Sequence, residues 1–341
     1  MIPLKTKKKI YDICLNKKVM ANKNVIWCDK KTLEKNLNGK VYIITGANSG
    51  VGFETTQQLI KQGAHVVMAC RRVGAGKEVA KAFSSLEGTF EVQYCDLTDL
   101  QSVRDFVDAF LNKHNRLDGL VCNAGFVNMY NTPDYTKDDF ETTIAASYIG
   151  HFLMTELLLE TLKGTEASRM LILSSVAHAG SPKKRYQVHL DDINWKKRKF
   201  NNIDAYCEAK VATALYALEL SDRLKETDVT TYSIHPGWAR SNFASGGNAV
   251  IKGLIAITKP IFRLLNFSDS SWESAQTSLH CLLSDEASKH SGAYFSQHSV
   301  LYRDKECKAG GWPMKSPNPH ANDISAARKM VAMSYEMVGL N

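Results

Sequence analysis

Residues 41–61 read VYIITGANSGVGFETTQQLIK, and this run joins the two elements from which the expected architecture follows. Its first five residues are a compact apolar run typical of a buried strand, and an amphipathic stretch typical of a helix begins at Phe53. A glycine-rich turn between a strand and a helix favours a phosphate-binding loop over glycines that only turn the chain, because the helix N-terminus offers free N–H groups. We expect this loop to hold a nucleotide through Gly46, Asn48, Ser49, Gly50, Val51 and Gly52.

The same alternation of apolar runs and amphipathic stretches continues along the chain. We expect further strands at residues 65–70, 90–94, 120–122, 169–174 and 229–234, and a helix over residues 100–113. Strands with continuous apolar runs that alternate with helices are typical of a parallel sheet covered on both faces. The sequence therefore predicts an α/β fold with a doubly wound parallel sheet. No linker or repeat divides it, so we expect one domain over residues 41–341 after a leader at 1–40.

Composition limits the class of protein. The 341 residues are 44% hydrophobic and 23% charged, which is ordinary for a globular chain. No uncharged apolar run reaches the roughly 18 residues of a membrane span, and the start MIPLKTKKK lacks the apolar segment of a secretory signal. Eight scattered cysteines without a CxxC pair favour buried, reduced thiols over a disulfide scaffold or a zinc ribbon. We therefore expect a cytoplasmic protein.

The net charge of +8 is concentrated in the leader. Residues 1–40 hold 11 of the 43 basic residues and three of the 35 acidic ones, so the rest of the chain is neutral. A solvated tail is the favoured interpretation, and contact with an anionic intracellular membrane surface is the alternative. The basic stretch at 183–199 is interpreted as a solvated loop, so we expect no nucleic acid partner. His178 and His235 lack metal-ligand spacing, and we expect no metal site.

The end of the second expected strand distinguishes NAD(H) from NADP(H). NAD-binding folds place an acid about 20 residues after the glycines, where it holds the ribose 2′-hydroxyl. This chain has Arg71 and Arg72 there and no acid. A guanidinium pairs bidentately with a 2′-phosphate, which a carboxylate would repel. The two arginines therefore favour NADP(H), and the alternative is a pair of solvated loop residues.

Further motifs follow the glycine loop in a fixed order. They are Cys95-Asp96-Leu97, Asn123-Ala124-Gly125, Ser174-Ser175, Tyr206-x-x-x-Lys210 and Pro236-Gly237-x-x-x-Ser241. Together they resemble the short-chain dehydrogenase/reductase family over residues 41–241. HLDDINW and HPGWARS resemble the subgroup of the retinol dehydrogenases and the WW-domain oxidoreductase, here without a WW module. The resemblance implies an NADP(H)-dependent oxidoreductase that interconverts a lipophilic alcohol and its aldehyde or ketone.

The resemblance also implies a role for each motif. Tyr206 would be the general acid/base, and Ser175 would hydrogen-bond the substrate oxygen. Lys210 lies one helical turn after the tyrosine on the same face, where it would lower the pKa of the tyrosine and bind the nicotinamide ribose. The cofactor would contact, besides the glycine loop and the two arginines, Asp96, Leu97, Asn123, Ala124, Gly125, Tyr206, Lys210, Pro236, Gly237 and Ser241.

Ser147 departs from the family pattern. The family has an Asn three residues before Gly150-His151-Phe152, and this Asn helps to hold a proton-relay water. A serine hydroxyl is shorter but can still donate and accept hydrogen bonds. The substitution therefore concerns the proton relay and not the cofactor site. The alternative function is a nucleotide-binding regulatory or scaffold protein with weak or lost turnover.

Residues 241–270 form the expected substrate lid. The segment is strongly apolar but is interrupted by Lys252, Lys259 and Arg263. Such a lid suits a lipophilic substrate such as a retinoid, a steroid or a fatty aldehyde. Contact with a membrane surface is the second interpretation and a core helix the third. The sequence is compatible with a homodimer and does not decide the oligomeric state.

Overall fold

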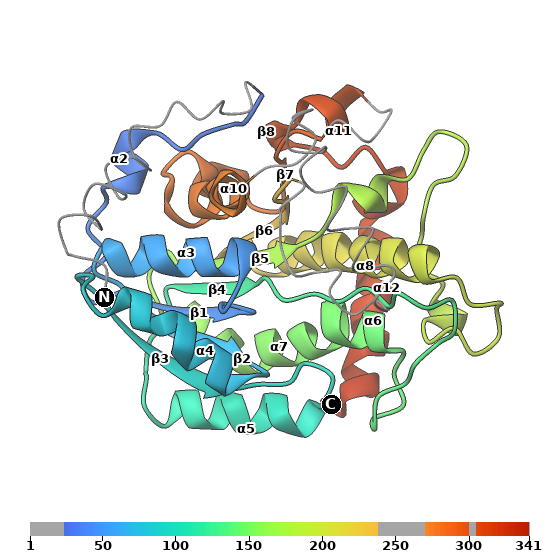
Figure 1. Cartoon of the computed structure of the whole chain (residues 1–341). Helices are drawn as coiled ribbons and strands as arrows, with labels where there is room; N and C mark the ends of the chain where they lie inside the picture. Colours follow the sequence, from blue (N-terminus) through green and yellow to red (C-terminus); the bar gives the residue numbers. More distant parts are fainter. Residues whose placement is uncertain (1–23, 238–269, 300–304, 341) are drawn as a thin grey trace, which may run out of the picture.

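The computed structural model describes residues 24–237, 270–299 and 305–340, and these carry one sheet in the strand order β3-β2-β1-β4-β5-β6-β7-β8 (Figure 1). Neighbouring strands from β3 to β7 are parallel, and β8 is antiparallel to β7. The strand bounds are β1 Val41–Thr45, β2 His65–Cys70, β3 Thr89–Tyr94, β4 Gly119–Cys122, β5 Arg169–Leu173, β6 Thr230–His235, β7 Tyr294–Ser296 and β8 Gly311–Met314.

Helices cover both faces of the sheet, and each face has its own apolar core. One face carries α5 (Leu100–Leu111), α7 (Gly150–Lys163), α8 (Asn202–Arg223) and α12 (Ile324–Val338). The other face carries α3 (Gly50–Lys61), α4 (Val73–Ala80) and α10 (Ser271–Leu283). In Figure 1, α3 and α10 lie above the strands and α5 and α7 below them. Two short helices, α6 (Thr142–Ile144) and α11 (Lys305–Ala309), lie in the connections.

The predicted doubly wound α/β fold is confirmed, and β1 and β2 have the predicted bounds. The two strands at the far edge of the sheet were not predicted. β7 has only three residues, too few for a period to be recognised, and β8 contains Pro313. Proline is tolerated in a strand at a sheet edge because no ladder hydrogen bond is needed there, and β8 has a neighbour on one side only.

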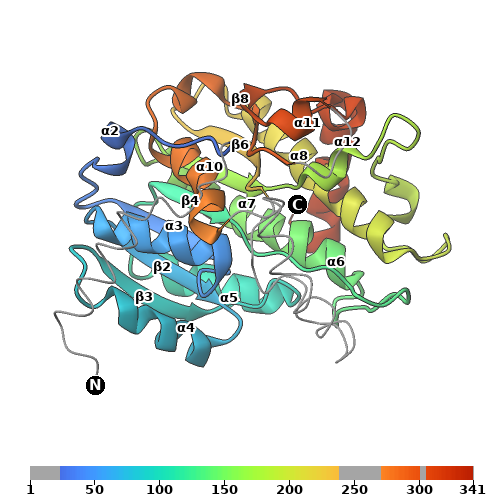
Figure 2. The same ribbon diagram turned by 45° about the horizontal axis from the view of Figure 1, so that its top comes forward.

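Part of the expected leader packs against the domain. Residues 24–40 include α2 (Lys30–Leu33), which lies beside α10 and α3 in both Figure 1 and Figure 2. Cys28 and Leu37 are buried in the core under α3 and α10, and the Cys28 N–H donates to Oε1 of Gln276 at 3.2 Å. We propose on this ground that the folded domain includes residues before 41, with Cys28 and Leu37 among them.

The cysteines agree with the sequence prediction. The seven in the described part of the chain are all buried, and no disulfide joins any two of them: Cys28, Cys70, Cys95, Cys122, Cys207, Cys281 and Cys307. None of the helices that the structure describes combines the length and the apolar character needed to cross a bilayer.

Candidate active site

The candidate site lies at the carboxyl ends of the strands, where the strand order reverses between β1 and β4. In doubly wound sheets ligands bind at this switch point, because the loops after the two central strands diverge there. The predicted residues follow five successive strand ends: Gly46 after β1, Arg71 after β2, Asp96 after β3, Asn123 after β4 and Ser174 after β5. Pro236 and Gly237 follow β6 in the same way.

The glycine loop forms a cradle that side chains would fill. Gly46 and Gly50 have φ of +64° and +57°, in the left-handed region that favours glycine. A Cβ on Gly52 would lie 2.5 Å from Nδ2 of Asn123 and 2.6 Å from the carbonyl oxygen of Gly46. Ser49, the N-cap of α3, makes no side-chain capping hydrogen bond, so the first N–H groups of the helix are left for a ligand. The loop therefore fits a pyrophosphate.

Thr45 ties the loop to the next strand. Its Oγ1 accepts hydrogen bonds from the N–H groups of Asn123 and Ala124, both at 2.9 Å, and Nδ2 of Asn123 donates to the Thr45 carbonyl at 2.7 Å. Nε2 of His151 lies 2.8 Å from the same hydroxyl, and burial lowers the pKa of His151 to about 4. The ring is therefore neutral and acts as a structural link. Sequence reasoning quoted both residues within motifs but gave neither a role.

Arg71 and Arg72 are exposed directly after β2, and Arg72 is the N-cap of α4. Neither guanidinium forms a hydrogen bond or an ion pair with a residue in the described ranges. Both arginines are thus available to an anion.

At the end of the next strand, β3, Oδ1 of Asp96 accepts hydrogen bonds from the N–H and the hydroxyl of Thr98 at 3.0 and 2.7 Å, and these bonds fix that turn.

The structure brings Tyr206, Lys210 and Ser175 together at the end of β5. Tyr206 and Lys210 lie on α8, and the side chain of Ser175 hydrogen-bonds Tyr206. Nζ of Lys210 lies 5.8 Å from the centre of the Tyr206 ring and donates to the Leu173 carbonyl at 2.8 Å. The hydroxyl of Ser174 donates to the Lys210 carbonyl at 2.7 Å, which fixes α8 against β5.

Burial controls the protonation of this group. It raises the pKa of Tyr206 to about 12, against the opposing effect of the Ser175 hydrogen bond. The expected lowering of this pKa by Lys210 is not seen, because Nζ of Lys210 donates to the Leu173 carbonyl instead. Burial lowers the pKa of Lys210 to about 8, because a buried ammonium loses hydration. Tyr206 therefore keeps its proton at neutral pH, which is the state that a proton donor to a carbonyl oxygen requires.

Ser147 lies in a single π-helical turn, Ala145–Ile149, that precedes α7. Such turns within α-helices occur frequently at functional sites. The Ser147 side chain is buried, and within the described part of the chain its hydroxyl has no hydrogen-bond partner. The carbonyl of Ser147 lies 3.2 Å from Nδ1 of His151, the histidine that contacts Thr45. Ser147 therefore lies beside the histidine that links β1 to the start of α7.

A segment near the C-terminus holds the loop that carries Ser175. Nδ1 of His178 donates to the Ser175 carbonyl, and Nε2 of His178 lies 2.6 Å from the Ser316 hydroxyl. Nδ2 of Asn318 donates to the carbonyls of His178 and Tyr186 at 2.7 and 2.8 Å. Nothing in the sequence indicated these contacts, since the partners are up to 140 residues apart.

The remaining predicted residues lie after β6, β4 and β3. Gly237 has a φ of +90°, so the chain turns sharply after Pro236. Ser241 lies outside the described residues, and so does the expected lid over 241–270 except for Ser270. Gly125 and Leu97 occupy the loops after β4 and β3. A Cβ on Gly150 would lie 2.2 Å from the Leu97 carbonyl, which shows how closely α7 approaches that loop.

Comparisons with known proteins agree with this geometry. A family model described as short chain dehydrogenase matches residues 40–185. Retinol dehydrogenase 13 of Homo sapiens is 35% identical over 308 residues, which are 89% of this chain and 85% of the relative. Retinol dehydrogenase 12 of Bos taurus is 37% identical over 311 residues, with coverage of 89% and 88%.

Solved structures share the fold. An uncharacterised protein from Mycobacterium paratuberculosis superimposes with a TM-score of 0.68 at 27% identity, covering 89% of this chain and 95% of that one. A 7α-hydroxysteroid dehydrogenase complexed with NADH and 7-oxo glycochenodeoxycholic acid superimposes with a TM-score of 0.58 at 23% identity, covering 79% and 96%.

Proposed function

Because the chain belongs to the short-chain dehydrogenase/reductase family, we propose that it is an NADP(H)-dependent oxidoreductase that interconverts a lipophilic alcohol and its aldehyde or ketone. The observation that carries this proposal is the group of Tyr206, Ser175 and Lys210, together with a glycine loop that has no room for side chains at Gly46 and Gly52. The relatives named retinol dehydrogenases favour a retinoid-like substrate. The chain would be cytoplasmic, with its basic leader in contact with a membrane surface, and it would there reach lipophilic substrates that are dissolved in the membrane.

The dinucleotide would be held across the switch point. The start of α3 would bind the pyrophosphate, Arg71 and Arg72 the 2′-phosphate, and Asp96 and Leu97 the adenine end. Asn123, Ala124, Gly125, Pro236 and Gly237 would line the nicotinamide half, with Ser241 as the remaining member of that set. When bound, NADP(H) supplies or accepts the hydride.

The chain's own residues handle the substrate oxygen and its proton. Tyr206 would donate its proton to the carbonyl oxygen as negative charge develops there, and Ser175 would hold the same oxygen in line. The hydrogen bond between these two side chains keeps both hydroxyls close to each other. Lys210 would bind the nicotinamide ribose, and its charge would favour the phenolate that remains after proton transfer.

The cofactor assignment predicts that NADPH binds more tightly than NADH and that Arg71→Asp reverses this order. A charged hydrogen bond contributes about 1.5–3 kcal/mol, so we expect roughly a tenfold or larger loss of NADPH affinity. Calorimetric titration of both nucleotides measures it. Lys77→Asp, an exposed position on α4, changes the charge equally and should leave the order unchanged. Equal affinities of the parent protein for both nucleotides would contradict the assignment.

Ser147, which stands where the family has an Asn, predicts a slow proton relay. Ser147→Asn supplies the longer amide and should raise kcat with little change in NADPH affinity, provided that proton transfer limits the rate. Ser147→Ala removes the hydroxyl without adding an amide, and it should not raise kcat. Steady-state kinetics on a confirmed substrate compare the three proteins. An Asn variant no faster than the parent would remove position 147 from the mechanism.

The proposed function is tested by the oxidation of NADPH with a panel of carbonyl compounds. The panel contains retinaldehyde, a steroid ketone, a long-chain fatty aldehyde and a small hydrophilic aldehyde. We expect turnover with the three lipophilic compounds and none with the hydrophilic aldehyde. Tight NADPH binding without turnover on any of them would instead support the nucleotide-binding regulatory or scaffold role.

A further inference from the structure

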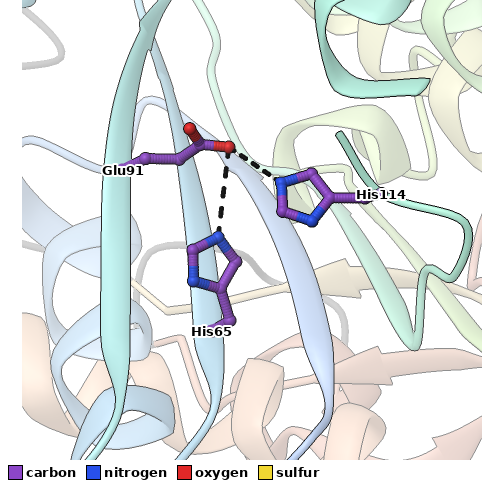
Figure 3. A group of neighbouring side chains, drawn as sticks. All are labelled: His65, Glu91 and His114. Atoms are coloured by element: carbon purple, nitrogen blue, oxygen red, sulfur yellow. Dashed lines mark hydrogen bonds and ion pairs between the residues drawn. The ribbon is translucent and has the colours of Figure 1, made fainter. Parts of the chain in front are cut away.

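Three side chains with metal-binding atoms meet at the edge of the sheet farthest from β8. His65 is the first residue of β2, Glu91 lies on the edge strand β3, and His114 follows α5. Nε2 of His114 lies 3.0 Å from Oε1 of Glu91, and Nε2 of His65 lies 4.0 Å from the same oxygen. Figure 3 shows both rings directed at this one carboxylate oxygen. From these positions we propose that His65, Glu91 and His114 bind a divalent transition metal ion such as Zn²⁺.

The distances suit one ion. The three ligand atoms all lie within 4.8 Å of one another. Zinc–nitrogen and zinc–oxygen bonds of about 2.0–2.2 Å in a tetrahedral site place neighbouring ligand atoms about 3.4 Å apart. The observed separations of 3.0 and 4.0 Å bracket that value, so small side-chain rotations close the site. Each of the three side chains is about one fifth to one quarter exposed, which leaves a fourth position open to water.

The ring of His65 is already oriented for metal binding. Its Nδ1 lies 2.7 Å from the hydroxyl of Thr89, and a second-sphere contact of this kind fixes the ring of a metal-binding histidine. Its Nε2, the nitrogen that faces Glu91, is buried and has no hydrogen-bond partner among the described residues.

Glu91 can accept the ion without losing its other contacts. Lys113 pairs with the second carboxylate oxygen, Oε2, at 2.9 Å, and Gln93 donates to Oε1 at 2.8 Å. The ion would take the position on Oε1 that the Nε2–H of His114 now occupies. His114 would then bind through an unprotonated Nε2 with its remaining proton on Nδ1, and no redox step is involved.

The donor set selects the class of ion. Two imidazoles and one carboxylate favour zinc and similar late transition metals, whereas calcium and magnesium prefer sites made of oxygen atoms alone. The ligands lie toward the amino ends of β2 and β3, away from the carboxyl ends where Tyr206 and the glycine loop lie. The ion would join β2, the edge strand β3 and the segment after α5, so its effect would be on stability rather than on the chemistry at Tyr206.

The test titrates the metal-free, full-length chain with Zn²⁺ and follows both calorimetry and the melting temperature. We expect one equivalent to bind and to raise the melting temperature. His114→Gln and Glu91→Gln should weaken this binding about tenfold to a hundredfold or more. His290→Gln is the matched control, because His290 forms an exposed pair with Glu286 at 3.3 Å and should leave the binding unchanged. NADPH affinity measured on each variant confirms that it is folded.

The parent protein loaded with Co²⁺ gives a second, independent measurement. Nitrogen and oxygen ligands produce visible ligand-field bands without the near-ultraviolet charge-transfer band of a cobalt–thiolate bond. A thiolate band would mean that the ion binds at cysteines, and equal Zn²⁺ affinity in the parent and in both triad variants would place it elsewhere. Either result, or the absence of binding to the parent, would overturn the proposal.

Discussion

Tyr206→Phe is expected to lower turnover by about 10²–10⁴-fold, the usual contribution of general acid–base catalysis, while NADPH still binds. The substitution removes only the hydroxyl that Ser175 contacts and leaves the ring beside Lys210. With its pKa at about 12, the tyrosine holds the proton that a reduced carbonyl oxygen must receive. The comparison requires kcat on a lipophilic aldehyde and the NADPH dissociation constant of both proteins.

Tyr216→Phe is the matched control for this prediction. Tyr216 lies on the same helix and is fully buried. Its hydroxyl donates to Oε1 of Glu156 at 2.7 Å and not to a residue of the candidate site. The control should lose stability but keep kcat per folded molecule. Full turnover in the Tyr206 variant would mean that another group supplies the proton.

Gly52→Val should weaken NADPH binding by roughly a hundredfold. Its Cβ would lie 2.6 Å from the backbone carbonyl of Gly46, which cannot rotate away, and 2.5 Å from the Asn123 amide that holds β4 to the loop. Overpacking of this kind costs about 1–3 kcal/mol, and it would deform the loop that binds the phosphates. If about 3 kcal/mol of this cost is lost from the free energy of binding, the affinity for NADPH falls by roughly a hundredfold. Fluorescence titration with NADPH measures the loss.

Gly74→Val separates this effect from the general cost of adding a side chain. Gly74 lies on α4, two residues after Arg72, and a Cβ there meets no atom within 4 Å. This variant should bind NADPH as the parent does. If Gly52→Val melts normally and also binds NADPH normally, the phosphates do not lie in this loop.

The elements that local physics determines were predicted well. β1, the glycine turn and α3 follow from an apolar run, the conformations that Gly46 and Gly50 adopt, and helical periodicity, all within 21 residues. The grouping of Tyr206, Lys210 and Ser175 could be expected because the i, i+4 spacing places the first two on one helix face, and the family resemblance added the serine.

The contacts that depend on tertiary structure could not be predicted. Asn318 supports the loop that carries Ser175 because the chain returns to this loop 140 residues later, and no local pattern indicates that return. The metal-binding group needs the pairing of β3 with β2, because His65, Glu91 and His114 are separated by more than 20 residues each and have no metal-site spacing. The sequence prediction of no metal site considered other histidines and did not reach this group.

The most direct test of the proposed chemistry is the fate of a deuterium label. The parent protein is incubated with retinaldehyde and NADPH deuterated at C4 of the nicotinamide, in separate reactions with the 4R and the 4S isomer. If the chain positions a carbonyl carbon against the nicotinamide through Ser175 and Tyr206, mass spectrometry should find deuterium on the carbinol carbon from one isomer and none from the other. An alcohol product without deuterium from either isomer, or no alcohol at all although NADPH is bound, would contradict the account.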